Sequence, residues 1–115
     1  MNSLGDEGEK IAQEFFKKKG FKILEKNYRT VFGEIDIIAK DKDVLVFIEV
    51  KTRADAAFGH PFEAVDRRKR EKIRKVALCY MKNLKKECAA RFDVLSINVE
   101  GGSEKIEHFR DAFEV

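Results

Sequence analysis

The pattern of hydrophobic and polar positions predicts two helices and five strands in the order αβββαββ. Ile11, Ala12, Phe15 and Phe16 recur at helical spacing and form one apolar stripe, whereas most of the later stretches alternate with the period of a strand. The expected elements are a helix over residues 6–19, strands over 21–29, 33–40 and 44–51, a helix from Pro61 to about Leu84, and strands over 91–99 and 105–115. Residues 52–60 are expected to form a loop, and the chain of 115 residues suits one domain, 1–115.

The strand expected over residues 44–51 carries apolar residues on both faces for most of its length. This is typical of a central strand that is covered on both sides. However, Asp36, Glu49 and Lys51 interrupt the apolar runs of this strand and the preceding one. Burying a charge is costly unless the charge is paired, so these three residues need an explanation.

The hydrophobic pattern fixes how the two strands pair. A turn within residues 40–43 places Ile37 opposite Ile48, Ile38 opposite Phe47 and Ile35 opposite Val50, so each apolar residue meets an apolar partner. The same register places two polar pairs opposite each other, Asp36 with Glu49 and Glu34 with Lys51. Two carboxylates are therefore expected with Cβ atoms roughly 5 Å apart on one face.

Like charges that lie opposite each other repel, so a cation must offset them. One alternative is an ion-paired cluster in which Lys51 and Arg53 neutralise the acids. The other is a divalent metal, since Mg²⁺ prefers oxygen ligands and is often held by one or two carboxylates with waters and substrate phosphates. Such a metal polarises a phosphate and lowers the pKa of a bound water, and a neighbouring lysine stabilises developing negative charge.

Composition and motifs exclude several classes of protein. The chain is 43% hydrophobic and 39% charged, and its longest apolar run, Val44–Ile48, is far shorter than the ~20 residues of a membrane span. The N-terminus lacks the pattern of a secretory signal, so a cytoplasmic protein without a membrane partner is expected. Cys79 and Cys88 are interpreted as structural, two histidines make a zinc cluster improbable, and neither GxGxxG nor GxxxxGK[ST] occurs.

One stretch is strongly basic although the net charge is only +3. Arg67–Lys75 contains seven basic residues and one acidic residue. Such a run is often a solvated helix face, and it is also the pattern expected of a surface that binds nucleic acid. The residues most relevant to the second interpretation are Arg67, Arg68, Lys69 and Arg70.

Asp36 followed by Glu49-Val50-Lys51 resembles the D…ExK signature of the restriction-endonuclease-like fold. A longer string resembles the YraN-type family of largely uncharacterised bacterial proteins over nearly the whole chain, and that family is similar to archaeal Holliday-junction resolvases. The string comprises Gly8-Glu9, Gly33-Glu34-Ile35-Asp36, Val46–Arg53, Phe58-Gly59, Lys69 and Arg91-Phe92-Asp93. Ile35 departs from the superfamily pattern, in which a proline often precedes the aspartate.

This resemblance implies an α/β fold with a mixed central sheet and helices on its faces. It implies that Asp36 and Glu49 hold Mg²⁺ (or Mn²⁺), with the backbone carbonyl of Val50 as a further ligand, and that Lys51 is the catalytic lysine. Glu9 matches the place of a further acid on the first helix, although an acid favoured by the helix dipole is equally consistent.

Two other basic residues have open roles. Lys69 lies on an apolar stripe of its helix, either snorkelling past the core edge or contacting phosphate near the site. Arg53 is either a phosphate contact or a surface residue, while Arg91 and Asp93 share a strand face and are expected to form an internal ion pair.

The predicted function is a Mg²⁺-dependent endonuclease that acts on DNA, including branched DNA. The alternatives are a nucleic-acid-binding module that keeps the fold without catalysis and a protein-interaction domain with ion-paired acids. Whether two chains pair as a homodimer to cut two strands is left open.

Overall fold

The computed structural model describes residues 4–53, 67–84, 87–100 and 102–113. It contains the predicted elements in the predicted order. Their bounds are α1 Leu4–Lys18, β1 Lys22–Thr30, β2 Gly33–Asp41, β3 Val44–Arg53, α2 Arg67–Lys82, β4 Ala89–Glu100 and β5 Ser103–Phe113. The helix start expected at Pro61 lies outside the described residues, as does most of the loop expected over residues 52–60. The first two residues of that loop, Thr52 and Arg53, belong to β3 instead.

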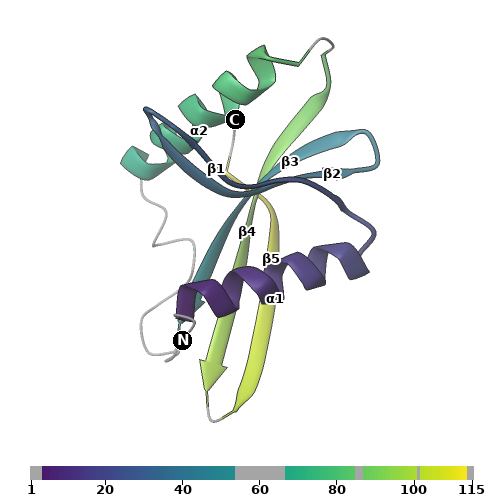
Figure 1. Ribbon diagram of the computed structural model, residues 1–115, viewed down its shortest axis with the longest axis vertical. Coiled ribbons are helices and arrows are strands. Elements are labelled where there is room, and N and C mark those ends of the chain that lie inside the picture. The colour runs from purple at the N-terminus through teal and green to yellow at the C-terminus, as the bar shows by residue number, and fades with distance from the viewer. Residues whose placement is uncertain (1–3, 54–66, 85–86, 101, 114–115) are drawn as a thin grey trace.

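The five strands form one mixed sheet in the order β1-β2-β3-β4-β5. β3 and β4 run parallel, and the other neighbouring pairs are antiparallel. The crossover that parallel pairing requires contains α2, which lies toward one end of the long axis, while the β4–β5 hairpin projects at the other end (Figure 1). The α/β fold with a mixed central sheet is therefore confirmed.

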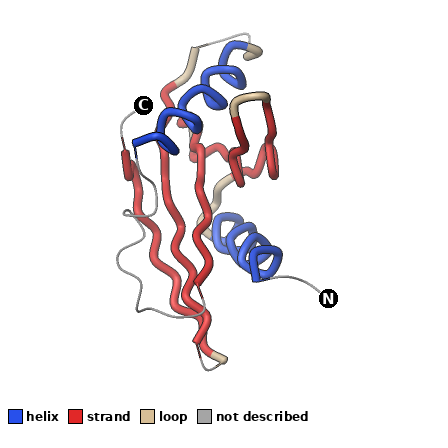
Figure 2. The backbone as a smooth tube through the Cα atoms, turned by 90° about the vertical axis from the view of Figure 1, so that its left-hand side faces the viewer, coloured by secondary structure: helices blue, strands red, loops and turns tan. Residues whose placement is uncertain are grey.

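Each face of the sheet carries its own hydrophobic cluster. On one face α1 buries Ala12 and Phe16 against β2, β3 and β4, and on the other face α2 buries Ile73, Val76 and Ala77. β3 contributes to both clusters, because Val46 and Ile48 point toward the α1 side whereas Leu45 and Phe47 point toward the α2 side. β3 is thus the central strand that the apolar pattern predicts, with a hydrophobic cluster on each face. Figure 2 shows the two helices beside the sheet.

The predicted register of the β2–β3 hairpin is confirmed over most of its length. Ile37 pairs with Ile48 and Ile38 with Phe47, and the ladder continues to Asp41 and Val44. The described ladder of β2 with β3 begins at Ile37 and Ile48, so the predicted pairs of Asp36 with Glu49 and of Glu34 with Lys51 lie beyond it and stay predictions.

The pairing predicted for Ile35 and Val50 is wrong. Ile35 packs in the α2-side cluster, whereas Val50 packs against the α1-side cluster. The physical reason is that the backbone ladder stops at this point, where the side chain of Asp36 accepts a hydrogen bond from the backbone N–H of Val50.

Gly8 allows α1 to approach the end of β3 closely. A Cβ atom added at Gly8 would overlap Oγ1 of Thr52 and would lie only 3.0 Å from its Cβ. The absence of a side chain at Gly8 therefore sets how near the first turns of α1, including the neighbouring Glu9, lie to the sheet.

We expect Gly8→Ala to destabilise the protein by about 1–3 kcal/mol, the usual cost of overpacking a tight contact. Gly5→Ala is the control, because Gly5 is exposed on the same helix and alanine there should be neutral or stabilising. Urea unfolding of both variants measures the difference, and equal stability of the two would contradict the close approach.

None of the helices in the described ranges is both long and apolar enough to cross a membrane.

Candidate functional site

The site forms where β2 and β3 separate. The backbone N–H of Val50 on β3 donates to Oδ2 of Asp36 at 2.7 Å, so the Asp36 side chain accepts in the place of a backbone carbonyl of its own strand, β2. This hydrogen bond anchors the Asp36 carboxylate next to Glu49, the residue before Val50. Although the two acids lie beyond the described ladder, the structure brings them together as the sequence predicts.

The Asp36 carboxyl is influenced by its burial and by the charge of Glu49. The pKa of Asp36 is raised to about 7, first by burial and then by the charge of Glu49, with smaller contributions from Glu9 and Glu34. The hydrogen bond from Val50 opposes this rise. A carboxyl group in this setting gains from any cation that enters between it and Glu49.

Glu49 is 9% exposed and is held by lysines from two elements. Its Oε1 atom lies 3.5 Å from Nζ of Lys51 on β3 and 3.2 Å from Nζ of Lys69 on α2. Lys69 therefore lies at the site, and its contact with phosphate stays a prediction. Glu49 is therefore ion-paired with both lysines.

Burial lowers the pKa of Lys51, and the neighbouring Lys69 adds to the effect, while Glu49 opposes it. Two ammonium groups that share one carboxylate oxygen repel each other. Burial and the repulsion from Lys69 therefore both favour the neutral form of Lys51.

Glu9 faces the site from the α1 side of the sheet. The amide nitrogen of Asn27 donates to Oε2 of Glu9 at 3.4 Å, and with the amide turned over it reaches both Glu9 at 3.0 Å and Glu34 at 3.1 Å. Asn27 has a positive φ of 51°, a conformation that asparagine adopts more readily than most residues. Sequence reasoning missed Asn27, and the signal that could have found it is an asparagine inside an otherwise regular strand.

The donors at the site fit a hard divalent cation that keeps several waters. Asp36 and Glu49 supply carboxylate oxygens that repel each other, and Glu9 adds a third acid whose charge Asp36 senses. Within the described residues, no group of three or more His, Cys, Asp or Glu side chains is arranged to hold a metal by itself. Two carboxylates with waters and substrate oxygens are, however, the usual way in which proteins bind Mg²⁺.

Comparison with known proteins identifies one family over most of the chain. The model of the uncharacterised protein family UPF0102 matches residues 8–97, which include Glu9, Asp36, Glu49, Lys51 and Lys69. The chain belongs to UPF0102. A UPF0102 protein of Thermodesulfovibrio yellowstonii is 54% identical over 96% of this chain and 95% of its own length. One from Trichlorobacter lovleyi is 46% identical over 98% of this chain and 91% of its own.

UPF0102 is described as an uncharacterised family, so its name states no activity. The YraN-type resemblance in the sequence and the family match agree. They identify the family without assigning a substrate, a metal or a reaction to it.

The basic residues of α2 form a second feature close to the site. Arg67, Arg68 and Arg70 are exposed, and Arg67, Arg70 and Arg74 line one helix face beside Phe113. They border an open hollow of about 360 Å³, with Glu71 as the one acid among its lining residues. The helix that carries Lys69 into the site thus also presents arginines at its surface.

The remaining predictions have mixed outcomes. Arg91 and Asp93 form the predicted internal ion pair, with 3.0 Å between Nε and Oδ1. Cys79 and Cys88 are free cysteines with partly buried side chains, and their structural interpretation stays a prediction. Arg53 is partly buried at the last residue of β3, and its contact with phosphate stays a prediction.

Proposed function

We propose that this UPF0102 protein is a metal-dependent endonuclease that hydrolyses DNA phosphodiesters. The observation that carries the proposal is the pair of acids at the β2–β3 separation, where Asp36 is anchored by Val50 and its pKa is raised to about 7 by burial and Glu49. Maintaining two repelling carboxylates beside a lysine costs stability, and a metal-dependent hydrolytic site is a reason to maintain them.

The residues have distinct proposed roles. Asp36 and Glu49 would hold Mg²⁺ (or Mn²⁺), with the backbone carbonyl of Val50 as a further ligand. When bound, the ion would polarise a phosphate and lower the pKa of a water. Lys51 would orient the attacking water or stabilise the charge that develops on the phosphate, because its pKa is already lowered by burial and its partner is shared.

The two lysines on Glu49 suggest how the site changes when it is loaded. Lys51 and Lys69 reach the same Oε1 atom, and a cation bound there would take over the neutralisation of Glu49. Both ammonium groups would then be available to oxygens of the substrate phosphate. Glu9 would support the site from α1 through Asn27, and the resemblance to resolvases suggests branched DNA as a substrate.

The arginines of α2 are proposed to hold the DNA backbone. If they neutralise phosphates, affinity for duplex DNA should fall steeply as salt rises, since bound counterions are released. Reversing the charge of Arg67, Arg68 and Arg70 together should weaken binding at least tenfold and flatten the salt dependence. Fluorescence anisotropy across a salt series measures both quantities.

The control for the helix variant is charge reversal at Lys82, which is exposed in the last turn of α2. Circular dichroism checks that the helix stays folded in both proteins. Affinity that is insensitive to salt and to the triple reversal would make this stretch a solvated face.

A cleavage screen tests the proposed activity. Labelled single-stranded, duplex, flap and four-way DNA, with matched RNA, are incubated with the protein in Mg²⁺ or Mn²⁺, and Glu49→Ala serves as the inactive control. We expect metal-dependent cleavage of at least one DNA substrate by the wild type alone. Cleavage that Glu49→Ala retains would come from a contaminant and would count against the site.

A non-catalytic nucleic-acid-binding module is the second candidate. The observation that favours it is that two lysines, Lys51 and Lys69, form ion pairs with Glu49. Salt-sensitive DNA binding without cleavage in either metal would support this candidate. A cytoplasmic location and pairing of two chains to cut two strands remain parts of the proposal, and a protein-interaction domain is the outcome if neither DNA binding nor cleavage occurs.

A further inference from the structure

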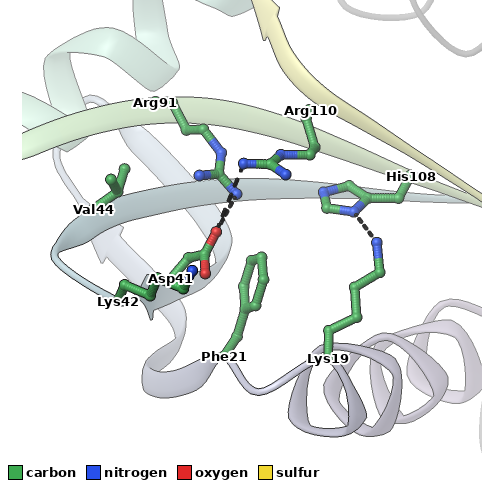
Figure 3. A pocket seen from close by; sticks show the side chains of 8 residues that line it. All are labelled: Lys19, Phe21, Asp41, Lys42, Val44, Arg91, His108 and Arg110. Carbon is green, nitrogen blue, oxygen red and sulfur yellow. Dashed lines mark hydrogen bonds and ion pairs between the residues drawn. The ribbon is translucent and has the colours of Figure 1, made fainter.

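A second charged pocket lies at the other end of the hairpin. Asp41, which lines this pocket, is five residues beyond Asp36 on β2, roughly 17 Å along an extended strand. The pocket has a volume of about 460 Å³, and its walls come from the end of α1, the β2–β3 turn, β4 and β5 (Figure 3). None of the proposed metal ligands lines it.

His108 forms a fixed part of this pocket. Its ring packs edge-on against Phe15, Phe16 and Phe21, and its side chain is 5% exposed. Nε2 lies 2.7 Å from Oδ2 of the fully buried Asp93, and Nδ1 lies 2.9 Å from Nζ of Lys19. Because an ionised carboxylate only accepts and an ammonium only donates, Nε2 carries the proton and Nδ1 accepts.

Asp93 remains ionised to hold this arrangement. Burial by itself would raise its pKa, but hydrogen bonds from His108, Arg91 and the backbone N–H of Asp111 lower it. The buried aspartate thereby fixes the His108 ring and one edge of the Arg91 guanidinium, and His108 in turn directs Lys19. The cations of the pocket are thus positioned by buried groups.

The pocket has more cationic than acidic groups. Arg91 lies 3.1 Å from Oδ2 of Asp41, and Arg110 lies 3.8 Å from the same atom (Figure 3). The lining residues include four cationic side chains, Lys19, Lys42, Arg91 and Arg110, and one acid, Asp41. With the buried Asp93, which pairs with Arg91, these six groups carry two net positive charges when His108 is neutral. The lysine ammonium has three N–H donors and the guanidinium has five, so the described hydrogen bonds leave donors of Lys19 and Arg91 for a ligand.

We propose that this pocket is a second anion site that binds a phosphate group. Two uncompensated positive charges match the charge of a phosphate monoester, and arginine and lysine donors in a partly enclosed site are the groups that recognise it. The phosphate could belong to a free nucleotide or to the end of a nucleic-acid strand, which share the same chemistry. The proposal does not depend on the metal site or on nuclease activity.

Calorimetric titration of the full chain with inorganic phosphate tests the proposal. The titration is made at constant ionic strength in chloride buffer with EDTA, so that the metal site cannot contribute. We expect saturable binding by the wild type, and at least a tenfold loss of affinity in the double variant Lys19→Met/Arg110→Met. Both residues are exposed, so their loss should leave the fold intact, which circular dichroism verifies.

The matched control is Lys17→Met/Lys105→Met, which removes the same charge from two exposed positions nearby. Lys17 lies in the last turn of α1, two residues before Lys19, and Lys105 lies on β5 with Arg110. Absence of saturable phosphate binding by the wild type, or equal weakening in the two double variants, would overturn the proposal. Titrations with deoxyadenosine monophosphate and with an oligonucleotide that carries a 5′-phosphate or a 5′-hydroxyl then assign the source. Tighter binding of the mononucleotide, or of the 5′-phosphorylated over the 5′-hydroxyl oligonucleotide, identifies the source of the phosphate. Loss of that tighter binding in Lys19→Met/Arg110→Met supports the site.

Discussion

Replacing Lys51 by methionine is expected to abolish DNA cleavage while leaving metal binding intact. Methionine keeps most of the length of the lysine stem and removes the ammonium group, which is proposed to act on the phosphate in the transition state. Loss of one such electrostatic contact costs on the order of 10²–10³-fold in rate. Glu49 keeps an ion-pair partner in the variant, because Lys69 lies 3.2 Å from it.

Single-turnover cleavage of the preferred substrate measures this effect, and Lys26→Met, which changes an exposed lysine on β1, is the control. The variant should bind Mn²⁺ with the affinity of the wild type. A cleavage rate within a few-fold of the wild-type rate would remove Lys51 from the mechanism, and loss of metal binding would show that the lysine has a structural role instead.

The second expected result is a rise in melting temperature when Mg²⁺ or Mn²⁺ is added. A ligand that binds only the folded state stabilises it by about 2.7 kcal/mol at a hundredfold excess over Kd. Asp36→Asn and Glu49→Gln should lose this dependence, because each removes a negative ligand without changing the size of the side chain. Differential scanning fluorimetry across a metal series measures the shift, with Asp43→Asn at the exposed β2–β3 turn as control.

The metal-free variants should behave in the opposite way. The folded-state pKa of Asp36 is about 7, above its ordinary value of 3.8, so the folded protein binds more protons than the unfolded chain between these values. Stability that involves Asp36 is therefore lost as pH rises from about 4 to 7. An asparagine at this position cannot ionise, so metal-free Asp36→Asn should be more stable than the wild type at pH 8, on the order of 1–2 kcal/mol after solvent screening.

This gain should shrink to almost nothing near pH ~3, below both pKa values, where the wild-type carboxyl is mostly protonated in both states. Chemical unfolding at both pH values in EDTA checks the sign. A metal-free Asp36→Asn protein that is less stable than the wild type at pH 8 would show that the Asp36 carboxylate is held favourably without a metal.

The sequence was sufficient to predict the register of the hairpin and the meeting of its acids. Apolar residues at alternate positions allow only one pairing of Ile37 and Ile38 with β3, and that pairing brings Asp36 near Glu49. What the pattern could not predict is the separation of the strands beyond Ile37. That separation depends on a hydrogen bond between a side chain and the backbone, from Val50 to Asp36, which leaves no trace in hydrophobic periodicity.

Contacts between distant segments could not be predicted from the sequence either. Lys69 lies on an apolar stripe of α2, and only the packing of that helix on the sheet shows that its ammonium group reaches Glu49. The hydrogen bonds from Lys19 through His108 to Asp93 connect the residue after α1 with β5 and β4, so no local sequence motif predicts them. Local pairing was predictable because neighbouring strands constrain each other, whereas these contacts require the tertiary arrangement.

Direct titration with Mn²⁺, followed by electron paramagnetic resonance of the free ion, tests the carboxylate pair as a metal site most directly. The wild-type protein should bind at least one Mn²⁺ per chain saturably, with Mg²⁺ as a competitor, and the double variant Asp36→Asn/Glu49→Gln should lose this binding. Equal Mn²⁺ binding by the two proteins, or no saturable binding by the wild type even with DNA present, would contradict the assignment of Asp36 and Glu49 as metal ligands.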